Sequence, residues 1–182
     1  MNRLLLWLTG FLPCRIISEG DQPYLERYYL MTLFGWRFYI HRFVASDPDR
    51  GLHDHPWPKA YSIILSGWYW EELRSGRRKV RWFNSLTGDT FHRVVLPEIV
   101  SETNEGMYFH PRFCWTLFFH TVGDTKAWGF WHDKENGDAT FTKFHYPGGV
   151  KNTDWHHSAL PGRFITRFPA GTGWRKKTLP HL

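Results

Sequence analysis

Hydrophobic and polar positions along most of this chain alternate over short segments, which is typical of strands. Runs of four to nine residues rich in aromatic and β-branched side chains are separated by Gly, Asp, Ser and Pro turns. The pattern predicts strands at residues 36–44, 60–65, 68–73, 79–84, 90–96, 114–121, 127–132 and 140–146. No long helical period follows residue 35, so we expect an all-β sandwich or barrel.

The two ends of the chain differ from this middle part. Residues 1–34 are expected to form an extension with one or two helical pieces packed outside the barrel. Residues 35–146 would form the barrel itself, with residues 97–112 as a polar loop. From Pro147 onward the sequence is rich in Gly, Pro and basic residues, which predicts an irregular basic tail over residues 147–182.

The composition indicates the number of domains and the cellular location to expect. Its 182 residues correspond to one domain, and aromatic residues reach 19%, which favours strands and pocket walls. Cys14 and Cys114 form neither a disulfide framework nor a zinc-type pair, so we expect a reducing, cytoplasmic location. The apolar stretch at residues 1–13 is too short to span a bilayer, and it predicts a helix that packs on the barrel or lies at an interface.

The net charge of +6 is unevenly distributed, because no acidic residue follows Asp154. A basic tail can be simply solvated, or it can contact nucleic acid, membranes or small anions. The sequence leaves these alternatives open.

The strongest chemical signal is a pair of histidines in an extended segment. His53 and His55 are two residues apart, so both imidazoles can lie on one face of a strand while Asp54 faces away. Two neutral imidazoles on one face form half of a metal site. A third histidine, His92, follows a Gly-Asp turn.

The segment GLHDHPWP, at residues 51–58, resembles the first motif of the cupin superfamily, in which a glycine precedes HxH and a glutamate and a second glycine follow. Here Ala60 occupies the glutamate position and Gly67 is the second glycine. Residues 88–92 (GDTFH) resemble a compact second motif, without its usual proline and asparagine. The resemblance covers roughly residues 36–132. It implies a jelly-roll barrel, a double-stranded β-helix, with one divalent metal on His53, His55 and His92.

The alanine at position 60 changes what the resemblance implies. Many cupins bind metal through three histidines and one glutamate, whereas this chain looks more like the three-histidine cupins, such as the thiol dioxygenases. That likeness implies iron(II), with open positions for a substrate and dioxygen. Manganese, nickel and zinc accept the same ligands and stay open as alternatives, as does a cupin that has lost its metal.

Further residues are candidates for the chemistry around the metal. Arg42 and Arg93 could hold a carboxylate or phosphate of the substrate, or could form structural ion pairs. His41 and His120 could be a fourth ligand or a proton carrier, and Tyr61 could line the pocket. For each of them the simpler alternative is a structural role in the core or on the outer face.

Three classes of function fit these features. The first is an iron(II) dioxygenase or related oxidoreductase that acts on a small polar or anionic molecule. The second is a metal-dependent isomerase or hydrolase on the same scaffold, and the third is a non-catalytic module that binds nucleic acid through its basic tail. A homodimer is a further expectation from the resemblance. The metal triad is the only feature of the sequence that favours an enzyme.

Overall fold

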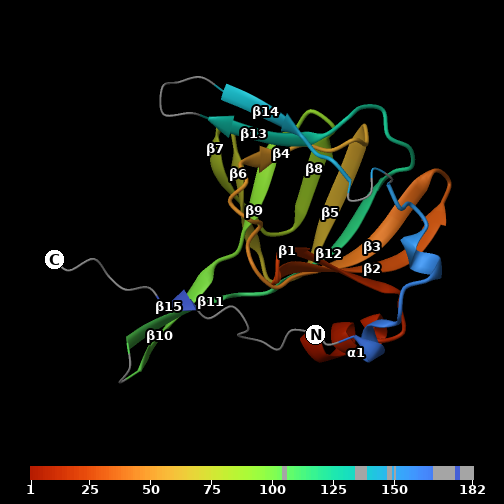
Figure 1. The fold of residues 1–182 in the computed structure, drawn as a ribbon. Helices are drawn as coiled ribbons and strands as arrows, with labels where there is room; N and C mark the ends of the chain where they lie inside the picture. Colours follow the sequence, from red (N-terminus) through yellow and green to blue (C-terminus); the bar gives the residue numbers. More distant parts are fainter. Residues whose placement is uncertain (104–105, 134–138, 147–148, 150, 166–174, 177–182) are drawn as a thin grey trace.

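The computed structural model describes residues 1–103, 106–133, 139–146, 149, 151–165 and 175–176. Two six-stranded antiparallel sheets face each other and form a barrel-like sandwich (Figure 1). A separate three-stranded sheet projects from one end. In the described part of the chain, no helix is long and apolar enough to cross a bilayer.

The first large sheet has the order β1-β2-β3-β12-β5-β8. Its strands are β1 (Cys14–Glu19), β2 (Gln22–Leu33), β3 (Trp36–Phe43), β12 (Cys114–Thr121), β5 (Lys59–Ser66) and β8 (Phe83–Thr87). The second has the order β14-β13-β4-β9-β6-β7. Its strands are β14 (Ala139–Lys143), β13 (Gly129–Asp133), β4 (Leu52–His53), β9 (His92–Val95), β6 (Tyr69–Leu73) and β7 (Gly76–Val80).

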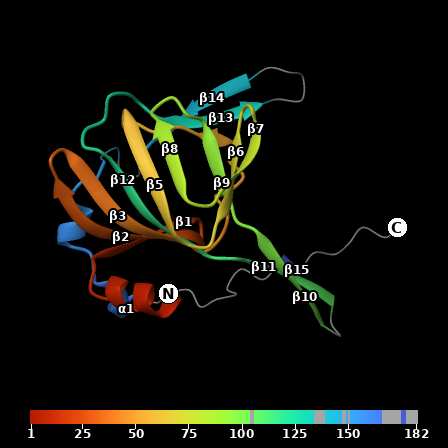
Figure 2. The same cartoon turned by 180° about the vertical axis from the view of Figure 1, so that it is seen from behind.

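The remaining elements lie outside this sandwich. The small sheet contains β10 (Glu98–Thr103), β11 (Gly106–Pro111) and β15 (Arg175–Lys176). One α-helix, α1 (Asn2–Thr9), and the two 3-10 turns η2 (Trp155–His157) and η3 (Gly162–Phe164) are described. Figure 2 shows α1 beneath the sheet that contains β2 and β3.

The core follows from the two-residue period of the strands. On β5, Ala60 and Ser62 are buried and alternate with Tyr61 and the exposed Ile63. One hydrophobic cluster fills the space between the sheets, and its buried members are Leu25, Phe43, Tyr69, Val80, Val94, Leu96 and Cys114. A second cluster, on the far side of β3, joins Ile40 and Trp115 to Leu5 of α1.

The structure differs from the sequence-based prediction in three segments. Residues 14–33 form β1 and β2 and extend the first sheet, where we expected only helical pieces outside the barrel. The expected loop at 97–112 contains the hairpin of β10 and β11. The expected strand at 79–84 is divided into β7 and β8 by bends at Arg81 and Trp82, where the exposed Trp82 side chain leaves the alternating pattern.

Candidate metal centre

Strand pairing brings the three predicted histidines together. His53 ends β4 and His92 begins β9, and these two residues lie directly opposite each other in the antiparallel pair. His55 follows β4 by two residues, so its side chain returns to the same face. The prediction that the three residues converge is confirmed, because one ligand nitrogen from each lies within 4.8 Å of the others.

Glycines allow the chain to approach closely around this cluster. Gly51 precedes β4 with φ of +82°, and a Cβ there would collide with the carbonyl oxygen of Trp131. Gly88 lies against the segment after His55, where a Cβ would meet the carbonyl oxygen of Trp57 at 2.8 Å. These two contacts explain why glycine frames both histidine motifs.

The spacing of the nitrogen atoms suits one metal ion. The Nε2 atoms of His55 and His92 lie 2.9 Å apart, and the His53 ring centroid is 4.7 Å from that of His92. Two imidazole nitrogens that bind one ion at right angles, each at about 2.0–2.1 Å, are themselves about 2.9 Å apart. The residues therefore fit a divalent metal held by three imidazoles.

Electrostatics favour the neutral, ligating form of the imidazoles. Burial lowers the pKa of His53 and of His55 well below the usual histidine value, and the neighbouring imidazoles lower it further. Both rings are thus neutral in ordinary buffers, with a lone pair free for a metal.

A fully buried carboxylate orients the third histidine. Glu71 Oε1 lies 2.9 Å from Nδ1 of His92 and also accepts a hydrogen bond from Asn84 Nδ2 at 2.7 Å. Arg78 donates to the other oxygen at 2.6 Å. Burial alone would raise the pKa of Glu71, but these hydrogen bonds outweigh it and lower the pKa. The charged carboxylate accepts a hydrogen bond from the Nδ1–H group of His92, so Nε2 keeps the lone pair that faces the cluster.

A second buried carboxylate anchors the segment between the other two histidines. Asp54 accepts hydrogen bonds from the backbone N–H of Gly129 and from Nζ of Lys126, both at 2.7 Å. Lys126 also bonds Asp89, which follows Gly88. As predicted from the alternation, Asp54 points away from the histidine cluster, where it ties the first motif to β13.

The space beside His55 is filled by stacked rings. Trp57 stacks on His55 at a centroid distance of 4.8 Å and on His120 at 3.9 Å. His120 is therefore separated from the metal site by an indole, while His41 stacks on Phe118 and accepts a hydrogen bond from Arg27. The structure brings neither histidine into the donor cluster.

Ala60 lies in an apolar environment, packed in the cluster with Tyr39, Leu86 and Phe118. A carboxylate at this position would be buried among apolar side chains, opposite the neutral imidazole of His120. We expect Ala60→Glu to destabilise the fold by at least about 3 kcal/mol without adding a metal ligand. Urea unfolding of the metal-free protein measures this, with Lys59→Glu on the exposed neighbour as a near-neutral control. A variant that is as stable as wild type and binds metal more tightly would contradict the placement.

The buried histidines outside the cluster predict a pH dependence of stability. Burial lowers the pKa of His120 to about 3 and that of His41 well below its usual value. In the unfolded chain both protonate near pH 6.5, so the stabilisation is complete above that pH and is lost as the pH falls below it.

The free energy of unfolding should fall by about 1.4 kcal/mol per pH unit for each of these two histidines. Urea titrations in chelator at pH 7, 6 and 5 would show this slope, and His120→Gln should make it shallower. The exposed His157→Gln is the control. Equal slopes in wild type and His120→Gln would refute the assignment.

The structure places both candidate arginines in ion pairs. Arg42, on the face of β3 opposite His41, is buried with Glu26 at 2.9 Å and lies over the Phe113 ring. Arg93 bonds Glu72 at 2.6 Å and also Asp49. These pairs match the structural alternative that the sequence left open, and they direct both guanidinium groups away from the histidine cluster.

Tyr61 lies on the outer face of its sheet. Its ring contacts Trp36, Phe83 and Phe119 at centroid distances between 5.4 and 5.8 Å. The alternation on β5 that buries Ala60 and Ser62 turns Tyr61 outward, so it does not line the space beside the metal site.

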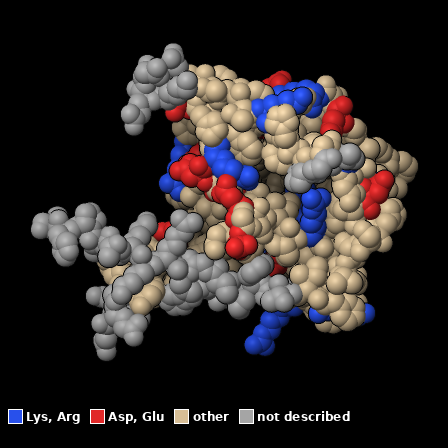
Figure 3. All heavy atoms as spheres, in the orientation of Figure 1, with Lys and Arg blue, Asp and Glu red and all other residues tan. Residues whose placement is uncertain are grey.

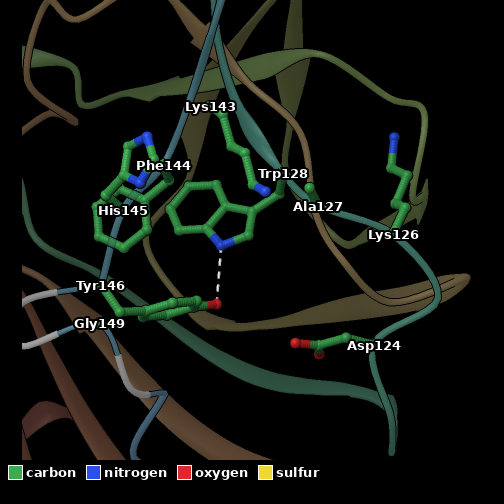
Figure 4. Close-up of a pocket in the computed structure, with 9 residues that line it drawn as sticks. All are labelled: Asp124, Lys126, Ala127, Trp128, Lys143, Phe144, His145, Tyr146 and Gly149. Carbon is green, nitrogen blue, oxygen red and sulfur yellow. Dashed lines mark hydrogen bonds between the residues drawn. The ribbon is translucent and has the colours of Figure 1, made fainter.

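A pocket adjoins the histidine cluster on the side of β13 and β14. Trp128 forms the shared wall, because its ring is 6.5 Å from that of His53 and its Nε1 donates to the Tyr146 hydroxyl at 2.9 Å (Figure 4). Lys143 and His145 also line this pocket. Figure 3 shows basic and acidic side chains around a hollow near the centre of this face.

Sequence reasoning missed the residues that support the site. Glu71 is the main one: the period of two that buries Tyr69 also buries Glu71 and leaves Glu72 partly exposed. That alternation was the available signal. The sequence carried no such signal for Asn84 and Lys126, because their hydrogen-bond partners lie far away along the chain.

The structure contains a second group with metal-ligand geometry. Asp154, His156 and His157 also place ligand atoms within 4.8 Å of one another, on the largely exposed turn η2. This group is an alternative place for a metal ion, on the surface and separate from the buried histidines.

The fold is shared with known cupins. No protein-family model and no curated protein matches the sequence. Among solved structures, the cupin-2 domain protein Rru_A2000 from Rhodospirillum rubrum superposes with a TM-score of 0.50, over 69% of this chain and 78% of that chain, at 12% identity.

Two other solved structures superpose less well. The DMSP lyase DddQ from Ruegeria pomeroyi DSS-3 gives a TM-score of 0.46, at 12% identity over 65% of this chain and 60% of that chain. The iron(II) form of HppE gives 0.42, at 8% identity over 60% of this chain and 56% of that chain. The first superposition and the histidine motifs together show that this chain has a cupin fold with a three-histidine group.

Proposed function

We propose that His53, His55 and His92 bind one divalent metal, and that the protein is a metal-dependent cupin enzyme, most simply an iron(II)-dependent oxidoreductase. The observation that carries the proposal is a donor set of three imidazoles in which the described residues supply no carboxylate. A divalent ion on such a set would retain its full charge and open positions for Lewis-acid or, for iron, redox chemistry.

The side chains around the site favour a small polar or anionic substrate. Lys143 and His145 line the pocket behind Trp128 and can attract an acidic group. The Tyr146 hydroxyl accepts a hydrogen bond from Trp128 and keeps its own proton for a ligand. These residues take the role that we first expected of Arg42 and Arg93, since both arginines are committed to ion pairs.

His120 is poorly suited to carry protons, because its pKa of about 3 is far from the pH of an ordinary reaction. We assign proton transfer to Tyr146 or to a group of the substrate. A homodimer, a cytoplasmic location and a nucleic-acid contact stay predictions from the sequence.

The test compares metals in one protein preparation. Metal-free protein is reconstituted with iron(II), manganese, nickel or zinc, and oxygen consumption is followed with small thiols, carboxylates and phosphates. We expect uptake with iron and none with zinc, which has no accessible second oxidation state. Substrate turnover that is equal with zinc and iron would reject the oxidative function and favour an isomerase or hydrolase. A salt-dependent nucleic-acid shift without any turnover would instead favour a binding module.

A further inference from the structure

The helix α1 presents its more apolar face to solvent. Leu4, Trp7, Leu8 and Phe11 follow the spacing i, i+3, i+4 and i+7, and their exposed fractions lie between 42% and 61%. The opposite side, with Leu5 and Thr9, is buried against the first sheet. A helix on the surface of a water-soluble protein usually has the reverse arrangement, with polar residues outward.

The segment at residues 160–164 extends this apolar surface. The N–H groups of Gly162 and Arg163 bond the carbonyl oxygens of Leu12 and Gly10, both at 3.0 Å, so η3 lies beside α1. Leu160 and Phe164 are also exposed there. We call Met1, Leu4, Trp7, Leu8, Phe11, Leu160 and Phe164 the α1 patch, and such a continuous exposed apolar patch marks an interaction surface.

The charged side chains in the described segments that form the α1 patch are arginines. Arg3 and Arg15 are exposed, and Arg163 lies over the rings of Phe11 and Phe164 at 5.1 and 4.8 Å. Residues 1–18 and 155–165, which form the α1 patch and its surroundings, contain Arg3, Arg15 and Arg163 and no Asp or Glu.

We propose that the α1 patch docks on the surface of an anionic phospholipid bilayer. Exposed Trp, Phe and Leu beside arginines and without acidic residues are the features of a helix that lies in the membrane interface. A helix of eight residues is about 12 Å long, so it can lie on a bilayer but not cross it. A second copy of the chain fits less well, since self-association would bring the arginines of both copies together.

The experiment is flotation of the whole protein with vesicles of phosphatidylcholine alone and of phosphatidylcholine mixed equally with phosphatidylglycerol. We expect binding to the anionic vesicles that weakens as salt is added. Trp7→Asp should reduce binding by about tenfold or more, the loss expected for one large apolar side chain. Arg3→Gln should reduce it by about fivefold at low salt.

Trp82→Asp is the matched control, because Trp82 is 74% exposed beside Arg81 and is not a member of the α1 patch. It should bind vesicles as wild type does, and circular dichroism checks that both tryptophan variants fold. No binding to anionic vesicles, or equal losses in Trp7→Asp and Trp82→Asp, would overturn the proposal. A dimer in solution that Trp7→Asp dissociates would also overturn it and assign the patch to self-association.

Discussion

Replacing His55 or His92 with alanine should abolish tight binding of one divalent metal. Each histidine supplies one of three nitrogen donors, so its loss leaves only two imidazoles. The metal affinity should fall by more than about 100-fold, because losing a ligand costs more than losing a residue that only orients one. Metal content after gel filtration, together with competition against a chelator, measures the effect.

The control for this prediction is His157→Ala. Its imidazole belongs to the largely exposed group with Asp154 and His156, whose ligand atoms also lie within 4.8 Å of one another. If the protein binds its metal there, His157→Ala loses the metal and His92→Ala keeps it, which would contradict the buried site. If the buried histidines bind it, the pattern is the reverse.

Removing the carboxylate behind His92 should have the second largest effect. Glu71 fixes the ring with Nε2 toward the cluster, and outer-sphere partners of this kind contribute about 10–100-fold in metal affinity. We expect Glu71→Gln to lower the metal affinity about tenfold, because the amide oxygen can still accept a hydrogen bond from Nδ1–H but carries no charge. Glu71→Ala should lose more, since it also leaves Asn84 and Arg78 without this partner.

Glu72→Gln is the matched control for Glu71→Gln. It changes the adjacent residue on the same strand, whose carboxylate binds Arg93 instead. Unfolding of the metal-free proteins separates lost stability from lost affinity. Unchanged metal affinity in Glu71→Gln, or an equal loss in Glu72→Gln, would show that the carboxylate does not orient the ligand.

The histidine site could be predicted because each of its two motifs is contained in a few consecutive residues. His53 and His55 share a face through a two-residue period, and His92 follows a glycine turn, so both motifs can be read within a few residues. The supporting contacts are not local. Glu71 meets His92 across a strand pair, and Arg42 meets Glu26 across another, at separations of 21 and 16 residues.

The fold was predictable to a similar degree. Aromatic and β-branched runs identified the strands of the sandwich, including β3 and β12. The polar composition of residues 97–112 concealed the β10–β11 hairpin, because a strand with little buried surface has no hydrophobic alternation to detect. Residues 14–33 were also missed, since the adjacent charged residues Glu26 and Arg27 fall on opposite faces of β2 and interrupt its alternation.

Elemental analysis of the protein purified without chelator tests the central claim most directly, when wild type and His92→Ala are measured side by side. Our account predicts about one equivalent of a divalent transition metal in wild type and almost none in the variant. Wild-type protein that binds no metal even after reconstitution, or equal metal content in both proteins, would contradict the assignment of His53, His55 and His92 as a metal site.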